Sequence, residues 1–261
     1  VDDSAFQVIR GILPVPPLMK PLLVLAAFPV VLMGWASCSH SGTGHAALPD
    51  PRAVDKSVPE YKNPFHPSTY AHFVARKDYR KTYDVYKDDT LLNRQPKKSR
   101  KIFVCLDEQR GQYLVDGLVA MDFPLSSGVK AYPTKTGDYA VISKKEDHTS
   151  NLYGKMYDAE GKCINYNAES TDPIPEGGRF DGSPMPYWQR LTNAGLGLHV
   201  GKVRRHPVSH GCVRLPRNVA EILYRQTSIG TPVTIQKTPL PVPEAQKIPP
   251  AQQQESEGRK Q

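Results

Sequence analysis

Short apolar runs separated by turn-forming residues fill the middle of the chain, and they predict β-strands. Residues 101–106 form one such run, and residues 107–111 are a turn that leads to a second run at 112–115, which predicts a hairpin. Residues 118–126 and 138–143 continue this spacing. Because no helical pattern lies between these runs, the sequence predicts a β-sandwich or barrel.

The clearest helical pattern covers residues 218–228. Asn218 can cap the N-terminus, and Glu221 lies where a carboxylate can reach back to the cap. One face of this helix is apolar and carries Val219, Ile222 and Leu223. Gly230 ends the pattern, and residues 231–236 predict a closing strand. The predicted fold class is therefore a β-rich mixed α+β fold with a short C-terminal helix.

The N-terminal part resembles a bacterial export signal. A lysine precedes a short apolar run at residues 21–34, and small residues follow the run. Residues 36–38 are similar to a lipobox, in which Cys38 receives lipid and becomes the first residue of the mature chain. Ordinary signal cleavage and an uncleaved anchor are the alternatives. Residues 1–18 fit no targeting pattern, so we expect Met19 to be the true start.

These patterns divide the chain into four parts. Residues 1–38 form the export signal, 39–98 a tether and basic stem, 99–237 the β-rich domain and 238–261 a tail. The tether is rich in Gly, Ser and Pro up to residue 63, and the tail is rich in Pro and Gln. Neither offers a regular set of apolar side chains to bury, so we expect a flexible tether and a disordered tail.

The charge pattern adds little about partners. The chain carries 34 Lys and Arg against 26 Asp and Glu, and residues 76–101 hold a dense group of these basic residues. Such a run is typically a solvated face, with contact to a polyanion as the alternative. No motif of alternating aromatic and basic residues accompanies it, so we expect no nucleic-acid partner.

Residues 197–212 concentrate side chains that can do chemistry, namely three His and one Cys among several Gly. A surface loop with an inert thiol is one interpretation. A zinc site is a second, but the spacing matches no familiar zinc pattern, and we expect neither metal nor cofactor. The third is a Cys-His acyl-transfer site, in which an imidazole takes the thiol proton and the amides of Gly211 and Cys212 bind the oxyanion.

This segment resembles the active-site motif of the L,D-transpeptidases, the YkuD-like catalytic domain. The resemblance rests on His199 and on the run Ser209-His210-Gly211-Cys212-Val213-Arg214-Leu215. Other stretches similar to the family are residues 127–128, 133–137, 185–188, 190–192 and 230–233. The resemblance covers about residues 99–237, which makes this part the expected catalytic domain.

The resemblance implies a role for each residue of the motif. Cys212 is the nucleophile and His199 the general acid/base, with its ring oriented by the carbonyl of Val200. His210 shapes the pocket beside the thiol, and Gly211 supplies an amide to the oxyanion hole. The residues expected to bind substrate are Ser209, Arg214, Tyr187 and Trp188.

A second histidine competes for the role of base. His206 lies between His199 and Cys212, in a loop that is shorter than many members of the family carry. We favour His199 because it follows a strand-like run, whereas His206 lies beside Pro207 in a predicted loop.

The activity implied by the resemblance is transfer of a peptidoglycan stem peptide. Cys212 would take the acyl group of a tetrapeptide stem as a thioester and release D-Ala, and a neighbouring stem amine would then form a 3→3 cross-link. Water as acceptor would make the enzyme an L,D-carboxypeptidase, and a protein lysine would make it an anchoring enzyme. A catalytically silent wall-binding module and a Cys peptidase of ordinary L-peptides are the alternatives. We expect the protein at the periplasmic face of a bacterial membrane, held by lipid on Cys38.

Two further thiols leave one covalent question open. An exported chain can join Cys105 to Cys163, but the sequence does not give their separation. We favour two unpaired thiols.

Overall fold

The structure, a computed structural model, describes residues 49–95, 99–239 and 241–247. The predicted export signal and Cys38 lie outside the described residues. Among the described residues, no helix is long and apolar enough to span a membrane. The described residues fall within a single unit, Ala46–Gln261.

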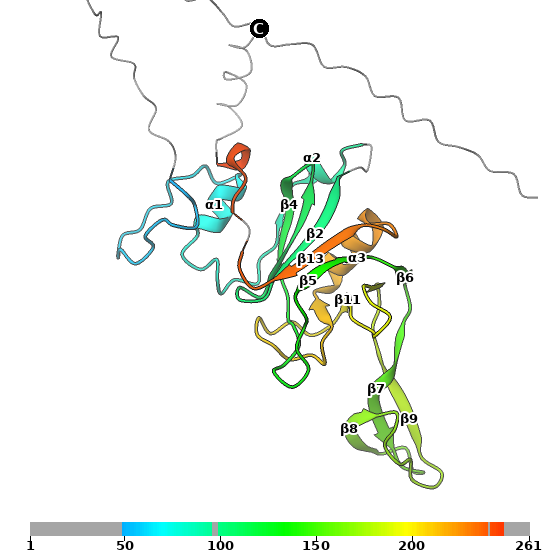
Figure 1. Cartoon of the computed structure of the whole chain (residues 1–261). Helices are drawn as coiled ribbons and strands as arrows, with labels where there is room; N and C mark the ends of the chain where they lie inside the picture. Colours follow the sequence, from blue (N-terminus) through cyan, green and yellow to red (C-terminus); the bar gives the residue numbers. More distant parts are fainter. Residues whose placement is uncertain (1–48, 96–98, 240, 248–261) are drawn as a thin grey trace, which may run out of the picture. The chain divides into compact units, whose positions relative to one another are not determined.

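The largest sheet has six strands and brings the two ends of the predicted catalytic domain together (Figure 1). Its strands, in spatial order, are β1 (Tyr86–Lys87), β4 (Leu118–Pro124), β3 (Arg110–Val115), β2 (Arg100–Cys105), β13 (Pro232–Gln236) and β5 (Gly137–Ala140). The predicted hairpin is confirmed as the antiparallel pair β2 and β3, and the predicted closing strand β13 runs parallel to β2. The sheet stays open, so the barrel alternative is wrong.

Two smaller sheets complete the β-rich part. The four-stranded sheet has the order β12 (Val213–Leu215), β11 (Gly197–Val200), β10 (Trp188–Arg190) and β6 (Ser143–Lys145). The three-stranded sheet has the order β8 (Cys163–Glu169), β7 (Thr149–Tyr157) and β9 (Arg179–Pro184), and it extends away from the other strands in Figure 1. Cys105 lies in β2 and Cys163 in β8, and both are free thiols.

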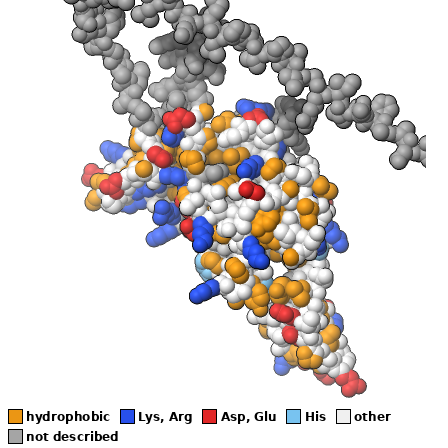
Figure 2. Space-filling model, in the orientation of Figure 1, with side chains coloured by type: hydrophobic (Ala, Val, Ile, Leu, Met, Phe, Trp, Pro, Cys, Tyr) orange, Lys and Arg blue, Asp and Glu red, His pale blue; other side chains and the backbone are white. Residues whose placement is uncertain are grey.

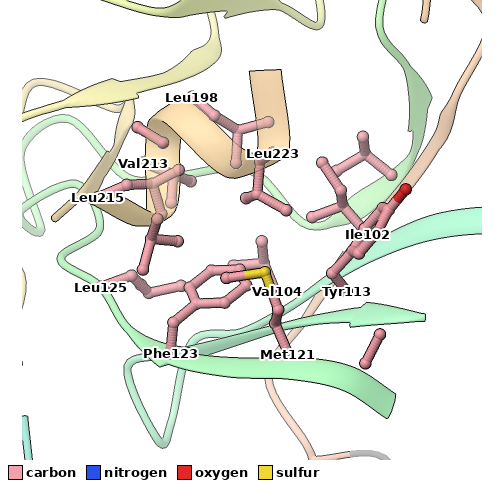
Figure 3. Packing of buried hydrophobic residues seen from close by; sticks show 14 of the residues in the cluster. Ile102, Val104, Tyr113, Met121, Phe123, Leu125, Leu198, Val213, Leu215 and Leu223 are labelled. Atoms are coloured by element: carbon pink, nitrogen blue, oxygen red, sulfur yellow. The ribbon is translucent and has the colours of Figure 1, made fainter. Parts of the chain in front are cut away.

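The main hydrophobic core lies between the six-stranded sheet and the elements that carry the motif. Figure 3 shows side chains of β2, β3 and β4 facing side chains of β11, β12 and helix α3 (Arg217–Gln226). Its fully buried members include Ile102, Val104, Phe123, Leu198, Val213, Leu215 and Leu223. Each such side chain stabilises the fold by roughly 1.5–3 kcal/mol through burial. The core therefore fixes β11 and β12 from one side.

Helix α3 differs from the sequence prediction at its start. It begins at Arg217 directly after Pro216, without a side-chain cap, so the predicted capping role of Asn218 is wrong. Pro216 already holds a backbone angle suited to helix entry. Glu221 pairs instead with Arg225, 2.6 Å away and one turn along the helix.

The predicted flexible tether differs from the structure over residues 49–63. The Lys56 ammonium donates to Val74 O at 2.7 Å, and the Tyr61 hydroxyl donates to Ala75 O at 2.8 Å. Both acceptors lie in or at the end of helix α1 (Tyr70–Ala75). Composition misled here because these contacts come from single polar side chains and not from an apolar period.

The basic stem is also folded. Helix α1 buries Tyr70, Phe73 and Val74 against Val119 of β4, and a second short helix, α2 (Asp89–Leu92), buries two leucines in the main core. Figure 2 shows basic and acidic side chains intermixed on the surface of this part. Residues 49–95 are therefore part of the same folded unit as the predicted catalytic domain.

A buried carboxylate joins residues 49–95, the N-terminal segment, to the six-stranded sheet. Asp122 of β4 is fully buried and pairs with the Arg110 guanidinium of β3. It also accepts hydrogen bonds from the hydroxyls of Tyr70 at 2.7 Å and Tyr79 at 2.9 Å. A buried charge is stable only when it is paired and hydrogen-bonded, and both tyrosines come from the N-terminal segment.

The first part of the tail, residues 241–247, packs against the folded unit, although the composition predicted disorder. Val242 is buried beside α1, and the Gln246 side chain makes two hydrogen bonds to the backbone of Val119, at 2.8 and 3.0 Å. Strand β1 pairs with β4 only at Asp122 and Met121, so the Gln246 amide takes the place of a strand partner at Val119. The expected disorder is therefore wrong for residues 241–247.

The Asp122 network predicts a large stability effect. We expect Asp122→Asn to lower the free energy of unfolding by about 3–5 kcal/mol, because the Arg110 charge stays buried without its partner. Urea denaturation measures the change. Asp181→Asn is the matched control, since Asp181 pairs with Arg179 on the exposed surface of β9 and we expect no measurable loss. Equal losses in the two variants would contradict the role of Asp122.

Candidate active site

The parallel pairing of β11 with β12 brings the two motif residues together. Leu198 lies opposite Val213 and His199 opposite Arg214, so Cys212 enters β12 beside Gly197. Side chains alternate along a strand, which places positions 197 and 199 on one face of β11. The Cys212 thiol donates to Gly195 O, 3.3 Å away, two residues before that strand begins.

His199 is held in one tautomer by the backbone. Its ring is buried, and Nδ1 lies 2.8 Å from Val200 O, the carbonyl that the resemblance implied. A carbonyl oxygen can only accept, so Nδ1 carries the proton. Nε2 is then unprotonated and can accept a proton from a thiol.

Trp188 supports His199 from the neighbouring strand β10. The indole is 2% exposed, and its ring centre lies 5.9 Å from that of His199. The indole also stacks with the ring of His148, with the two ring centres 5.0 Å apart. A Cβ on Gly197 would lie 2.5 Å from the same indole, so only glycine fits there. Trp188 is therefore a buried support, which differs from the expected contact with substrate.

Tyr187 faces a different part of the molecule. Its ring lies 5.6 Å from that of Tyr224 on α3, and its backbone has a left-handed φ of 55°. The structure therefore places Tyr187 against the helix, whereas Trp188 contacts His199.

Burial sets the charge state of both motif residues. It lowers the pKa of His199 to about 4, against the opposing effect of the Val200 carbonyl. Burial also raises the pKa of the Cys212 thiol, although the Gly197 backbone and Arg214 oppose this rise. At neutral pH the Cys212 thiol and the His199 imidazole are therefore both uncharged.

The turn before Cys212 is built on residues 128–134, which overlap the two stretches 127–128 and 133–137 that are similar to the family. Thr134 Oγ1 donates to Gly211 O at 2.6 Å and accepts from Gly128 N–H at 2.8 Å. A Cβ on Gly128 would lie 2.0 Å from Tyr132 O and 2.8 Å from Gly211 Cα. The close approach of two glycines thus fixes the backbone next to the thiol.

Ser209 closes the same turn from inside. It is 2% exposed, its hydroxyl donates to Cys212 O, and it accepts the Gly211 N–H at 3.2 Å. The structure therefore places Ser209 in the turn, away from the expected contact with substrate. Because the Gly211 amide already has an acceptor, the Cys212 amide is the better candidate for an oxyanion.

His210 packs in an aromatic wall beside the turn. Its ring stacks on Tyr153 of β7 at 4.4 Å and lies 4.8 Å from the ring of Tyr132. Burial and then Arg214 lower the pKa of His210. No local sequence pattern predicts a role for Tyr132 or Tyr153, because nothing in it shows that the three-stranded sheet reaches the motif.

Arg214 supplies the positive charge at the site. Its side chain is half-buried, and within the described ranges none of the ion pairs involves it. Burial lowers its pKa, and the Cys212 thiol is the group that opposes this effect. An incoming carboxylate would meet a cation that has no protein carboxylate to displace.

His206 lies outside this arrangement. It is exposed, and its Nδ1 is 3.3 Å from Pro207 O. In the part of the chain that the structure describes, no group of three or more His, Cys, Asp or Glu could hold a metal ion.

The chain belongs to the family of the YkuD L,D-transpeptidase catalytic domain, whose model matches residues 99–235. A curated relative, "Probable L,D-transpeptidase 3" of Mycobacterium tuberculosis (strain ATCC 25618 / H37Rv), is 31% identical over 121 residues. That match covers 44% of this chain and only 38% of the relative.

Solved structures of L,D-transpeptidases are also similar. The catalytic domain from Enterococcus faecium is 28% identical, covering 53% of this chain and 98% of that chain with a TM-score of 0.39. The L,D-transpeptidase LdtMt1 in complex with imipenem is 21% identical, covering 53% and 59% with a TM-score of 0.41. The membership of the family rests on the match to its model.

The neutral pair predicts a specific pH dependence. We expect no thiolate absorbance from Cys212 at pH 7, measured at 240 nm as the difference from Cys212→Ser, because burial raises the thiol pKa. We also expect the acid limb of acylation near the His199 pKa of about 4, since activity needs neutral His199 and is lost as the pH falls through this value. Full thiolate absorbance at pH 7 would show a thiolate-imidazolium pair instead.

Proposed function

We propose that this protein is a cysteine-dependent L,D-transpeptidase that acts on peptidoglycan stem peptides through a thioester on Cys212. The observation that supports it best is His199, with Nδ1 held by Val200 O at 2.8 Å, on the strand beside Cys212. General-base activation of a thiol requires an imidazole oriented in this way, so the observation supports the proposal.

The first half-reaction uses both residues. Cys212 Sγ attacks the carbonyl between the diamino acid and the terminal D-Ala of a tetrapeptide stem, and the thiol proton passes to Nε2 of His199. The Cys212 amide stabilises the oxyanion. The C–N bond then breaks, His199 returns the proton to the leaving amine, and D-Ala departs from the thioester.

The second half-reaction restores the thiol. An amine on a neighbouring stem attacks the thioester, His199 takes its proton and returns it to Sγ, and a 3→3 cross-link results. Water in place of the amine gives an L,D-carboxypeptidase, and a protein lysine gives wall attachment. Incubation with disaccharide tetrapeptides separates the transpeptidase from the carboxypeptidase. The transpeptidase yields cross-linked dimers, whereas the carboxypeptidase yields tripeptide monomers.

Charge and exposure suggest how the stem peptide binds. Arg214 is a cation beside Cys212 that can pair with a stem carboxylate. The rings of Tyr132 and Tyr153 lie next to the ring of His210. We place the protein at the periplasmic face of a bacterial membrane, because its proposed substrate is there. Lipid on Cys38 remains a prediction.

A silent wall-binding module is the second candidate. Wall binding alone does not need an imidazole held in one tautomer, as His199 is by Val200 O. The module is therefore the weaker hypothesis.

Covalent labelling tests the nucleophile. At pH 7 we expect a tetrapeptide stem or imipenem to add once to the protein, and peptide mapping to place the adduct on Cys212. Cys105 and Cys163 are internal controls, since burial raises the pKa of Cys105 to about 11 and Cys163 lies in β8, outside the motif. Cys212→Ser should remove the adduct. An adduct that survives in this variant would exclude Cys212 as the nucleophile.

The choice of base has its own test. We expect His199→Ala to slow acylation by about 10²–10⁴-fold, because the thiol loses the group that accepts its proton. His206→Ala should leave most of the rate, since His206 is exposed and lies in the loop. Stopped-flow acylation by imipenem measures both variants, and the reverse pattern would assign the base to His206.

A further inference from the structure

The loop that joins β11 to β12 carries the catalytic turn and is held unevenly. Gly201 N–H donates to Leu215 O at 3.0 Å where the loop leaves β11. Near Cys212, the amides of Val208 and Ser209 both donate to Ser127 O, at 2.8 and 3.0 Å. Both ends are thus fixed by the predicted catalytic domain itself.

The middle of the loop is attached differently, through Arg205. Its guanidinium donates from Nη1 to Thr82 O at 2.5 Å and from Nη2 to Glu108 O at 2.7 Å. Nη1 also lies 3.4 Å from Tyr79 O. The Arg205 backbone is left-handed, with a φ of 56°, which is a strained position for a residue other than glycine. Tyr79 and Thr82 precede residue 99, where the match to the family model begins.

Residues 79–82, which accept two of these hydrogen bonds, have further contacts with the sheet. Tyr79 is 2% exposed, and its hydroxyl donates to the buried Asp122. Its ring lies 4.9 Å from the Arg110 guanidinium and 5.7 Å from that of Arg52. Arg110 also donates to Thr82 O at 3.2 Å. The Tyr79 and Thr82 carbonyls that accept from Arg205 are therefore anchored to the Asp122 network.

We propose that Arg205 is a positioning residue for acyl transfer, through which residues 79–82 hold the loop that leads to Cys212. This rests on the proposed function. Arg205 contacts neither His199 nor Cys212 among the described interactions, so it acts through the backbone of the loop. Without it the middle of the loop keeps the Arg204 N–H bond to Ser126 Oγ, at 2.8 Å, as its side-chain anchor.

The consequence is kinetic. A displacement of about 1 Å at a reacting group can cost about 100-fold in rate. We expect Arg205→Ala to slow acylation of Cys212 by about tenfold or more. The dissociation constant for imipenem before acylation should change little, because the Arg205 guanidinium binds the Thr82 and Glu108 carbonyls and has no described contact with the thiol.

The experiment uses the full chain with four proteins: wild type, Arg205→Ala, Arg205→Lys and Arg94→Ala. Lysine can donate to Thr82 O or Glu108 O but does not have the forked donors that reach both, so we expect Arg205→Lys to recover part of the rate. Arg94→Ala is the matched control, since Arg94 also joins the N-terminal segment to the sheet, through an exposed pair with Asp116 at 3.2 Å. We expect it to acylate like the wild type.

Three readouts separate positioning from loss of fold: the thermal midpoint, the acylation rate constant with its dissociation constant, and hydrogen exchange of residues 202–212. We expect faster exchange and slower acylation in Arg205→Ala while the thermal midpoint stays within a few degrees. If Arg205→Ala does not fold, a slower rate in a stable Arg205→Lys variant supports the proposal, and an unchanged rate there overturns it.

The outcomes also separate this inference from the proposed function. An acylated wild type with an equal rate in folded Arg205→Ala overturns the inference alone. An equal rate loss in Arg94→Ala overturns it as well, because any loosening of the segment would then suffice. A wild type that forms no adduct overturns the proposed function and this inference with it.

Discussion

The parallel pairing of β11 with β12 is the contact on which the site depends. It sets His199 opposite Arg214 and brings Cys212 to the start of the strand that carries the histidine. Parallel neighbours usually need a long crossover with a helix, and here a loop of residues 201–212 makes the connection. Such a loop depends on contacts with the rest of the chain for its conformation. Its conformation comes from Thr134 and Gly128 near the thiol and from Arg205 in the middle.

Burial gives this site its chemistry as well as its geometry. The hydrophobic core on one side and Trp188 next to His199 remove water from the imidazole, which keeps it neutral and ready to accept a proton. The same burial keeps the thiol protonated. In the proposed reaction, proton transfer to His199 and attack by the thiol then occur together when a substrate carbonyl is bound. A site of this kind limits the adventitious reactions of a free thiolate.

The folded unit is larger than the part that matches the family model. Residues 49–95 supply the two tyrosine hydroxyls that donate to Asp122. Residues 241–247 supply the Gln246 side-chain amide, which bonds to the backbone of Val119 in β4. A fully buried Asp122 would be costly without these partners. The N-terminal segment is therefore required by a charge within the six-stranded sheet, and it reaches the active-site loop through Arg205.

Local patterns in the sequence determined the hairpin of β2 and β3, the closing strand, a helix near residue 217 and the motif around Cys212. These features depend on neighbours in the chain, on apolar runs between turns and on reactive residues at short spacing. Long-range contacts decided the rest. Asn218 matched a cap pattern, but Pro216 began the helix; Ser209 and Trp188 looked available to substrate, but neighbours distant in the chain bury both. The folded stem and the charge states of His199 and Cys212 follow from burial. Burial is a property of the assembled core, so no single segment of the sequence determines it.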